Sequence, residues 1–212
     1  MTDYQTFAVV EHHVLDPLYA TPWGDARATD FYGVFDPGQF LPWLGYDGLF
    51  NAGFDADQYE PQLQQRLAVP TDVTVAISGL ELAANTYDIT AEVCVEAGGV
   101  GKTMRIYVVQ VLDNYPPSEL YYRNSFMQAA ATEDVVVAPG ECVQVMRSFT
   151  FDATSMAQME DIKIVAWAQE PLDVYPAEVH QATESAWPFV DLTIFHDGFD
   201  SGELTEWSGS NP

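Results

Sequence analysis

The long segments after Thr71, in which apolar and polar residues alternate, constrain the fold most. From Tyr87 to Glu96 every second residue is apolar, which predicts a strand with one buried and one solvated face. Met104–Leu112 and Ile162–Ala168 are more continuously apolar, as expected for central, buried strands. Turn signals separate these runs at Gly98-Gly99, Pro116-Pro117 and Pro139-Gly140. The pattern predicts an antiparallel β-sandwich of immunoglobulin-like size over residues 71–188.

The first 70 residues have a different sequence pattern, with short apolar runs and helix signals. Phe7–Val10 predicts a buried strand. Thr21-Pro22 offers an N-cap followed by proline at the first helical position, so we expect a helix there that carries Arg27 and ends near Gly33.

A hairpin and a second helix are expected next. Asp47-Gly48 is a hairpin signal. The helix that follows has Tyr59, Leu63 and Leu67 on one stripe and is closed by Pro70. We therefore divide the chain into a mixed unit over residues 1–70, the sandwich over 71–188 and an acidic C-terminal tail over 189–212, an α+β protein.

Charge excludes some partners. The chain has 32 acidic and seven basic residues, a formal net charge of −25. Such a surface repels phosphate backbones, so we expect no nucleic-acid partner. No apolar run approaches the ~18 residues that a membrane span needs, so we expect no membrane insertion. The first residues lack the features of a signal peptide; if the protein is exported, its signal is not in this chain.

Three stretches of the sequence resemble the outer-membrane-protein-twenty-eight family of secreted bacterial proteins. They are His13 to Val34, with Asp16-Pro17 and Arg27-Ala28; Pro42 followed by Asp47-Gly48; and Ile162–Gln169 with Glu178–Ala182 behind it. The resemblance implies a thioredoxin-like domain joined to an immunoglobulin-like β-sandwich, and a location outside the cytoplasm, in the extracellular space or cell envelope.

The chain departs from this family where redox chemistry would be. We expect a truncated thioredoxin-like part, because the sequence contains no Cys-x-x-Cys motif and both cysteines fall in the predicted sandwich. A redox dithiol needs two nearby thiols, one with a lowered pKa. Trp43 stands where the family pattern has threonine after Pro42. We therefore expect no enzyme activity and no cofactor.

The cysteines themselves indicate an oxidising compartment. By alternation, Cys94 and Cys142 both lie on the polar face of their strands, beside Glu92 and Gln144. Reduced cysteines are more often buried in the core. We expect a cross-strand disulfide, with two unrelated thiols as the alternative.

Two groups of residues suggest metal ligands. His12-His13 follow the first predicted strand, but adjacent strand residues point to opposite faces, which favours a structural role. In the tail, Asp197, Asp200 and Glu203 offer oxygen ligands around glycines. They do not have EF-hand spacing, so calcium and a solvated acidic tail both stay open; the surrounding stretch is similar to segments near the ends of many secreted bacterial proteins.

Three functions follow from these observations. The first is a non-catalytic surface protein that assembles with copies of itself into a filament or layer, with Val190, Leu192, Ile194 and Phe195 in a strand that adds to a sheet edge. The second is a monomeric extracellular ligand-binding module whose binding loop contains Phe40, Pro42, Trp43 and Tyr46, with Trp23 nearby. The third is an inactive fragment of a thiol-disulfide redox protein.

Overall fold

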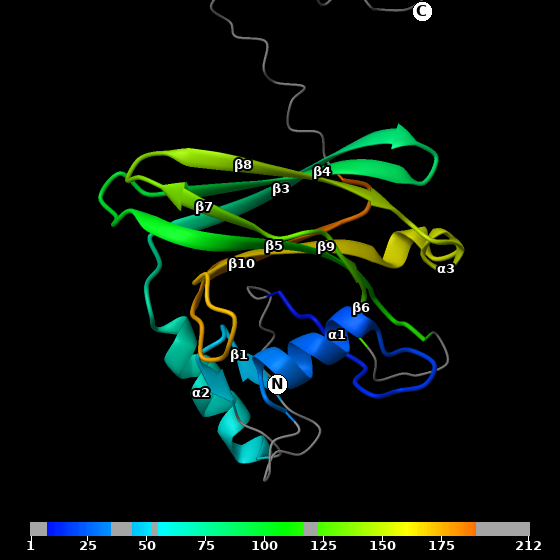
Figure 1. Cartoon of the computed structure of the whole chain (residues 1–212), viewed down its shortest axis with the longest axis horizontal. Coiled ribbons are helices and arrows are strands. Elements are labelled where there is room, and N and C mark those ends of the chain that lie inside the picture. Colours follow the sequence, from blue (N-terminus) through cyan, green and yellow to red (C-terminus); the bar gives the residue numbers. More distant parts are fainter. Residues whose placement is uncertain (1–7, 35–43, 52–54, 117–122, 190–212) are drawn as a thin grey trace, which may run out of the picture.

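The chain folds into three layers in the computed structural model, which describes residues 8–34, 44–51, 55–116 and 123–189 (Figure 1). A three-stranded sheet forms the outer layer, a five-stranded sheet lies in the middle, and the N-terminal helices with a small hairpin lie beneath it. In the described residues, no helix is long and apolar enough to cross a membrane.

The two large sheets are antiparallel throughout. The three-stranded sheet has the order β3-β4-β8, with bounds Val73–Ala83, Thr86–Val95 and Cys142–Thr150. The five-stranded sheet has the order β10-β9-β5-β6, and β7 pairs with the first half of β5. Its bounds are Val179–Ala186, Ile162–Gln169, Lys102–Leu112, Ser125–Ala129 and Glu133–Val137 for β10, β9, β5, β6 and β7.

The remaining elements are short. The N-terminal part contains α1 (Pro22–Ala26), the π-helix η1 (Arg27–Phe31), the hairpin β1 (Gly45–Tyr46) and β2 (Phe50–Asn51), the 3-10 turn η2 (Ala56–Gln58) and α2 (Tyr59–Leu67). The sandwich part adds α3 (Ala153–Met156) and η3 (Met159–Asp161) between β8 and β9. The α+β class expected from the sequence is confirmed.

The sandwich core forms as the alternation predicts. On β4, Tyr87 and every second residue to Val95 are at most 5% exposed, and they face β5 and β9 across the sandwich. This core also contains Met104, Ile106, Phe149, Phe151, Ile162 and Ile164.

The five-stranded sheet is buried on both faces, which explains the continuous apolar run of β5. Its inner face joins the sandwich core, and its outer face carries a second cluster that includes Tyr107, Trp167 and Phe126. Trp23 of α1 and Val10 pack on this outer face. The predicted 1–70 unit therefore shares a hydrophobic cluster with the sandwich.

Most N-terminal elements form where the sequence places them. Thr21 accepts a hydrogen bond from the backbone N–H of Gly24 at 3.0 Å and caps α1. Gly33 follows η1 with a φ of 63°. Asp47 and Gly48 have φ values of 46° and 66°, the two left-handed residues of a type I′ hairpin turn.

One local expectation is wrong and another holds only in part. Residues 8–10 form no strand; only Glu11 makes an isolated parallel bridge, to Ser125. Val9 is 37% exposed, so the apolar run has only one packed side. The helix α2 forms as expected, but its predicted apolar stripe is only partly buried: Tyr59 and Leu63 are half-buried and Leu67 is 44% exposed. Arg66 is the buried residue of the helix.

One end of the sandwich is filled by Phe189, the first residue of the predicted tail. Phe189 packs on Tyr87 and Phe151, with ring centroids 5.7 and 6.2 Å apart. Gly79 on β3 leaves it room, because a Cβ at Gly79 would lie 2.6 Å from Cβ of Phe189.

Gly79→Ala is therefore expected to lower the free energy of unfolding by about 2 kcal/mol through overpacking. Gly98→Ala is the matched control, since no atom lies within 4 Å of the added Cβ, and it should change stability by less than about 0.5 kcal/mol. Urea unfolding of both variants measures the difference. Equal stability of the two would contradict the packing of Phe189 against Gly79.

Candidate functional site

Nearly all of the few positive charges of this acidic chain are paired with carboxylates. Six of its seven basic residues form ion pairs with carboxylates: Arg66, Lys102, Arg105, Arg123, Arg147 and Lys163. Arg27 is the seventh, and no described carboxylate lies within 4.0 Å of its guanidinium. Arg27 is also only 8% exposed. The chain therefore buries one cation that the described carboxylates do not neutralise.

Neutral groups hold the Arg27 guanidinium in place. One terminal N–H donates to the hydroxyl of Tyr107 at 3.1 Å, and the other terminal nitrogen donates to Oε1 of Gln169 at 2.7 Å. Gln169 is fixed in turn, because its Oε1 also accepts from Trp167 Nε1 and its Nε2 donates to the carbonyl of Ala177. The side chain of Arg27 is thus positioned by neutral groups, without a charged partner among the described residues.

Aromatic rings surround the same guanidinium. Its carbon lies 3.7 Å from the ring centroid of Phe31, 4.8 Å from that of Tyr107 and 5.1 Å from that of Tyr32. Trp23 and Trp167 lie farther away, each at 6.0 Å. Cation–π attraction from these rings offsets part of the cost of burying the charge.

Two of these aromatic side chains come from the outer face of the five-stranded sheet. Tyr107 on β5 and Trp167 on β9 are direct cross-strand partners, and their rings stack at 4.7 Å. Both point outward from the sandwich because they alternate with the inner residues Ile106 and Ala168. Register therefore places two large rings under η1.

Arg27 itself begins a π-helical turn. The backbone N–H of Tyr32 donates to the carbonyl of Arg27, five residues back, at 3.1 Å. Such turns are rare and are found frequently at functional sites. The turn presents Arg27 and Phe31 together toward β5.

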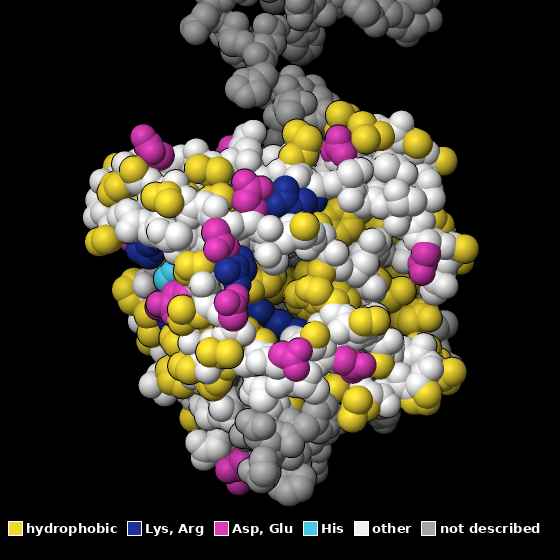
Figure 2. All heavy atoms as spheres, in the orientation of Figure 1, with side chains coloured by type: hydrophobic (Ala, Val, Ile, Leu, Met, Phe, Trp, Pro, Cys, Tyr) yellow, Lys and Arg dark blue, Asp and Glu magenta, His cyan; other side chains and the backbone are white. Residues whose placement is uncertain are grey.

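A recess of about 260 Å³ opens beside these residues. Arg27, Trp23, Phe31 and Tyr107 contribute to its wall, and so does the exposed Leu172. Figure 2 shows the face of the molecule drawn in Figure 1, where hydrophobic and Lys or Arg side chains lie in a hollow between acidic ones.

The wall of the recess also carries charges of both signs. Arg105 donates to Asp134 at 2.7 Å and to Asp173 at 2.7 Å, and these bonds raise its pKa above the ordinary value. Asp173 and the exposed Asp30 both line the recess. Arg105 is therefore already neutralised, whereas no described carboxylate neutralises Arg27.

His12 lies near this group, half-buried and with a neutral ring. It contacts Phe126 and Trp23 with ring centroids 5.1 and 5.7 Å apart, and its Nδ1 has no hydrogen-bond partner among the described residues. Burial, with smaller contributions from the charges of Arg27 and His13, lowers the pKa of His12 from 6.5 to about 4. His13 Nε2 instead lies 3.0 Å from the hydroxyl of Ser125. The two histidines face different surroundings, as expected for structural residues.

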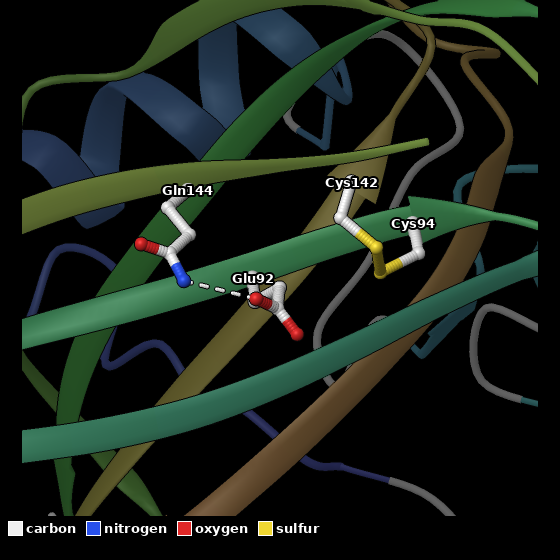
Figure 3. Close-up of a disulfide and its surroundings, with 4 residues drawn as sticks. All are labelled: Glu92, Cys94, Cys142 and Gln144. Atoms are coloured by element: carbon white, nitrogen blue, oxygen red, sulfur yellow. Dashed lines mark hydrogen bonds between the residues drawn. A yellow bond between two sulfur atoms is a disulfide. The ribbon is translucent and has the colours of Figure 1, made fainter. Parts of the chain in front are cut away.

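The predicted disulfide is present. Cys94 and Cys142 are direct partners in the β4–β8 register and are joined through a 2.03 Å S–S bond (Figure 3). Beside them the amide of Gln144 donates to Glu92 at 2.9 Å on the same solvated face. Glu92 and the two sulfurs also lie within 4.8 Å of one another, but the disulfide leaves no thiolate to bind a metal. Closing a ring of 48 residues stabilises a fold by about 4 kcal/mol in the chain-entropy account.

Several predicted site residues lie outside the described residues. They are Phe40, Pro42 and Trp43 of the binding loop, Val190, Leu192, Ile194 and Phe195 of the assembly strand, and Asp197, Asp200 and Glu203 of the calcium group. Tyr46 is described and lies on β1, where burial raises the pKa of its hydroxyl. Trp23, expected near a ligand surface, lines the recess.

Arg27 is the residue that sequence reasoning did not single out as a site. A signal for it does exist, because Trp23 and Phe31 stand four residues before and after it, on the same side of a helix. Its neighbours from the sheet, Tyr107 and Gln169, are 80 and 142 residues away in sequence. Only the strand register brings them to Arg27.

Comparison with known proteins gives a fold and no family. No family model matches the sequence, and no curated protein matches it. Among solved structures, HBP35 of Porphyromonas gingivalis superposes with a TM-score of 0.50 at 10% identity, over 60% of this chain and 45% of HBP35. At that identity the likeness shows a shared fold, and this chain spans less than half the length of HBP35.

Two further neighbours are more distant. A domain of the outer membrane lipoprotein Omp28 from Porphyromonas gingivalis has a TM-score of 0.42 at 13% identity, over 56% of this chain and 90% of that domain. Beta-glucosidase from Kluyveromyces marxianus has a TM-score of 0.32 at 15% identity, over 61% of this chain and 16% of the enzyme.

The lowered pKa of the half-buried His12 generates a pH prediction. Because its folded pKa is about 4 and its unfolded value is 6.5, only the unfolded chain takes up this proton as the pH falls from 6.5 to 4. Stability is therefore lost over that window, by up to about 3 kcal/mol from this group. His12→Phe should remove the loss, so urea unfolding of wild type and variant should give parallel stability profiles above pH 6.5 that diverge below it. Profiles that stay parallel down to pH 4 would show that His12 does not titrate in this way.

Proposed function

We propose that this chain is a non-catalytic ligand-binding module of an exported protein, with the recess around Arg27 as its binding site. The observation that carries the proposal is that Arg27, alone among the seven basic residues, is buried beside a recess with no described carboxylate partner. A buried charge is costly unless it is paired. The chain has 32 acidic residues, so a scarcity of carboxylates does not explain why none of the described ones pairs with Arg27. A ligand with a negative group would complete the site.

Export is supported by the disulfide. Cys142 is exposed and Cys94 is half-buried, so the bond lies within reach of reductants. Disulfides persist in oxidising compartments and are rare in the cytosol. This supports an extracellular or cell-envelope location, in keeping with the sequence resemblance to the outer-membrane-protein-twenty-eight family, to which we propose the chain is related.

A binding role rather than catalysis is supported by the state of the nucleophiles. Both cysteines of the chain are in the disulfide. Ser125 lies beside His13, but it is 1% exposed and its hydroxyl donates to the carbonyl of Tyr115. A serine held in this way is out of reach of a substrate.

The test compares the two buried arginines. Arg66 is 9% exposed and pairs with Asp47 and Glu178 at 2.6 and 3.0 Å, so Arg66→Met leaves both carboxylates unpaired and should cost about 2 to 3 kcal/mol. Arg27→Met removes a charge that no described carboxylate balances, and it should change the free energy of unfolding by less than about 1 kcal/mol. Urea unfolding of both variants gives the comparison.

A loss for Arg27→Met as large as that for Arg66→Met would identify Arg27 as a structural cation held by its aromatic rings. The observation that carries the proposed binding site would then be lost, because the neighbours of Arg27 within the chain would account for its burial.

Self-association is a second candidate, favoured by the edge of β3. In the described residues this strand of eleven residues pairs only with β4, and Leu80 and Leu82 on it are 50% and 54% exposed. Long edge strands with apolar side chains are templates for pairing with another chain. The net charge of −25 opposes association at low salt and is screened at high salt.

Light scattering after size exclusion tests this candidate. We expect a species heavier than the 23.5 kDa monomer whose share rises with salt. Leu80→Lys on β3 should abolish it, whereas Val136→Lys, a 74% exposed position on β7, should not. A single 23.5 kDa species at every salt concentration would argue against assembly.

A further inference from the structure

We infer that the ligand of the Arg27 recess is a small zwitterion, a compound with one carboxylate, one ammonium group and an apolar side chain, such as a free apolar amino acid. This inference rests on the proposed binding function and names its ligand class. It combines the hydrogen-bonding capacity of Arg27, the carboxylates of the recess, the net charge of the chain and the shape of the recess.

The carboxylate is indicated by the way Arg27 is held. A guanidinium has five N–H donors, and the bonds to Tyr107 and Gln169 use two of them. The face of the group is covered by Phe31, 3.7 Å from the guanidinium carbon, so a ligand approaches the edge of the plane. An edge of paired N–H groups matches the two oxygens of a carboxylate.

The ammonium group is indicated by Asp30 and Asp173. Both line the recess beside Arg27. Asp173 is 88% exposed and bonds Arg105 through one oxygen, and among the described residues Asp30 accepts only from the neighbouring Thr29 hydroxyl. Each carboxylate keeps acceptor capacity for an ammonium group and repels a second negative charge.

The net charge of the chain also favours a zwitterion over an anion. At −25 the protein repels any ligand with a net negative charge, such as phosphate or a simple carboxylic acid anion. A zwitterion has no net charge, so it avoids this repulsion and still offers its carboxylate to Arg27.

The volume and lining of the recess fit a compound of the size of one amino acid. Its volume of about 260 Å³ lies just below the range of roughly 300–1,000 Å³ typical of pockets for drug-sized ligands. Trp23 and Leu172 give it apolar walls, and Figure 2 shows hydrophobic side chains in the hollow. An apolar side chain would cover these walls and exclude water from the Arg27 contact.

Three matched compounds test the inference on the wild-type protein. Phenylalanine carries both charged groups, phenylalaninamide lacks the carboxylate, and 3-phenylpropanoate lacks the ammonium group. Isothermal titration calorimetry is expected to detect phenylalanine binding at millimolar concentrations or below. Each of the other two should bind at least about tenfold more weakly, since each loses the charge-assisted hydrogen bonds of one ionic group.

Two variants assign the two charged groups to their residues. Arg27→Met should abolish phenylalanine binding. Asp30→Asn, at an exposed position, should weaken phenylalanine binding and leave 3-phenylpropanoate unchanged or bound more tightly. Arg123→Gln is the control for loss of one positive charge, because Arg123 is 63% exposed and does not line the recess; it should bind phenylalanine like wild type.

The outcomes separate the ligand class from the binding function. If 3-phenylpropanoate binds as tightly as phenylalanine and Arg27→Met removes both, the zwitterion is overturned and the binding site stands. If phenylalanine does not bind, or binds Arg27→Met as well as wild type, the zwitterion inference is overturned. The proposed function itself is decided independently, by the stability of Arg27→Met against Arg66→Met.

Discussion

The burial of the five-stranded sheet on both faces is the constraint on which the rest of this structure depends. Its inner face completes the sandwich core with β4 and β8, and its outer face holds Tyr107 and Trp167 against the N-terminal helices. Large aromatic rings facing outward from a sandwich need a cover, because exposing them to water is unfavourable. The N-terminal segment supplies it, so the sandwich and the preceding residues share their packing.

That cover creates the site. The π-helical turn η1 lies over the stacked rings of Tyr107 and Trp167 and places the guanidinium of Arg27 beside them. Gln169 and Tyr107 give the guanidinium hydrogen bonds but no charge. In contrast, Arg66 bridges Asp47 of the hairpin and Glu178 beside β10, and ties the second helix to the sheet. Two arginines of equal burial therefore have different electrostatic surroundings, one balanced within the chain and one open to a recess.

The sequence predicts local features whose cause is local. The hairpin at Asp47-Gly48 forms because both positions adopt positive φ, and α1 begins at Pro22 because Thr21 caps it. The disulfide was predictable because alternation puts Cys94 and Cys142 on the solvated face. The strand expected at Phe7–Val10 does not form over residues 8–10. An apolar run in the sequence shows neither which of its sides will be packed nor whether a neighbouring strand has an open edge.

The sequence by itself determined the sandwich, its turns, its charge and its disulfide, because period-two alternation, turn residues and cysteine placement act over a few residues or along one strand. Only the tertiary structure decided what Arg27 does. Its partners Tyr107, Trp167 and Gln169 come from strands far away in the chain, and a shift of one residue in β5 or β9 would turn them inward. Whether a buried cation has a carboxylate beside it depends on that register and on the path of η1. Neither can be predicted from a short stretch of sequence.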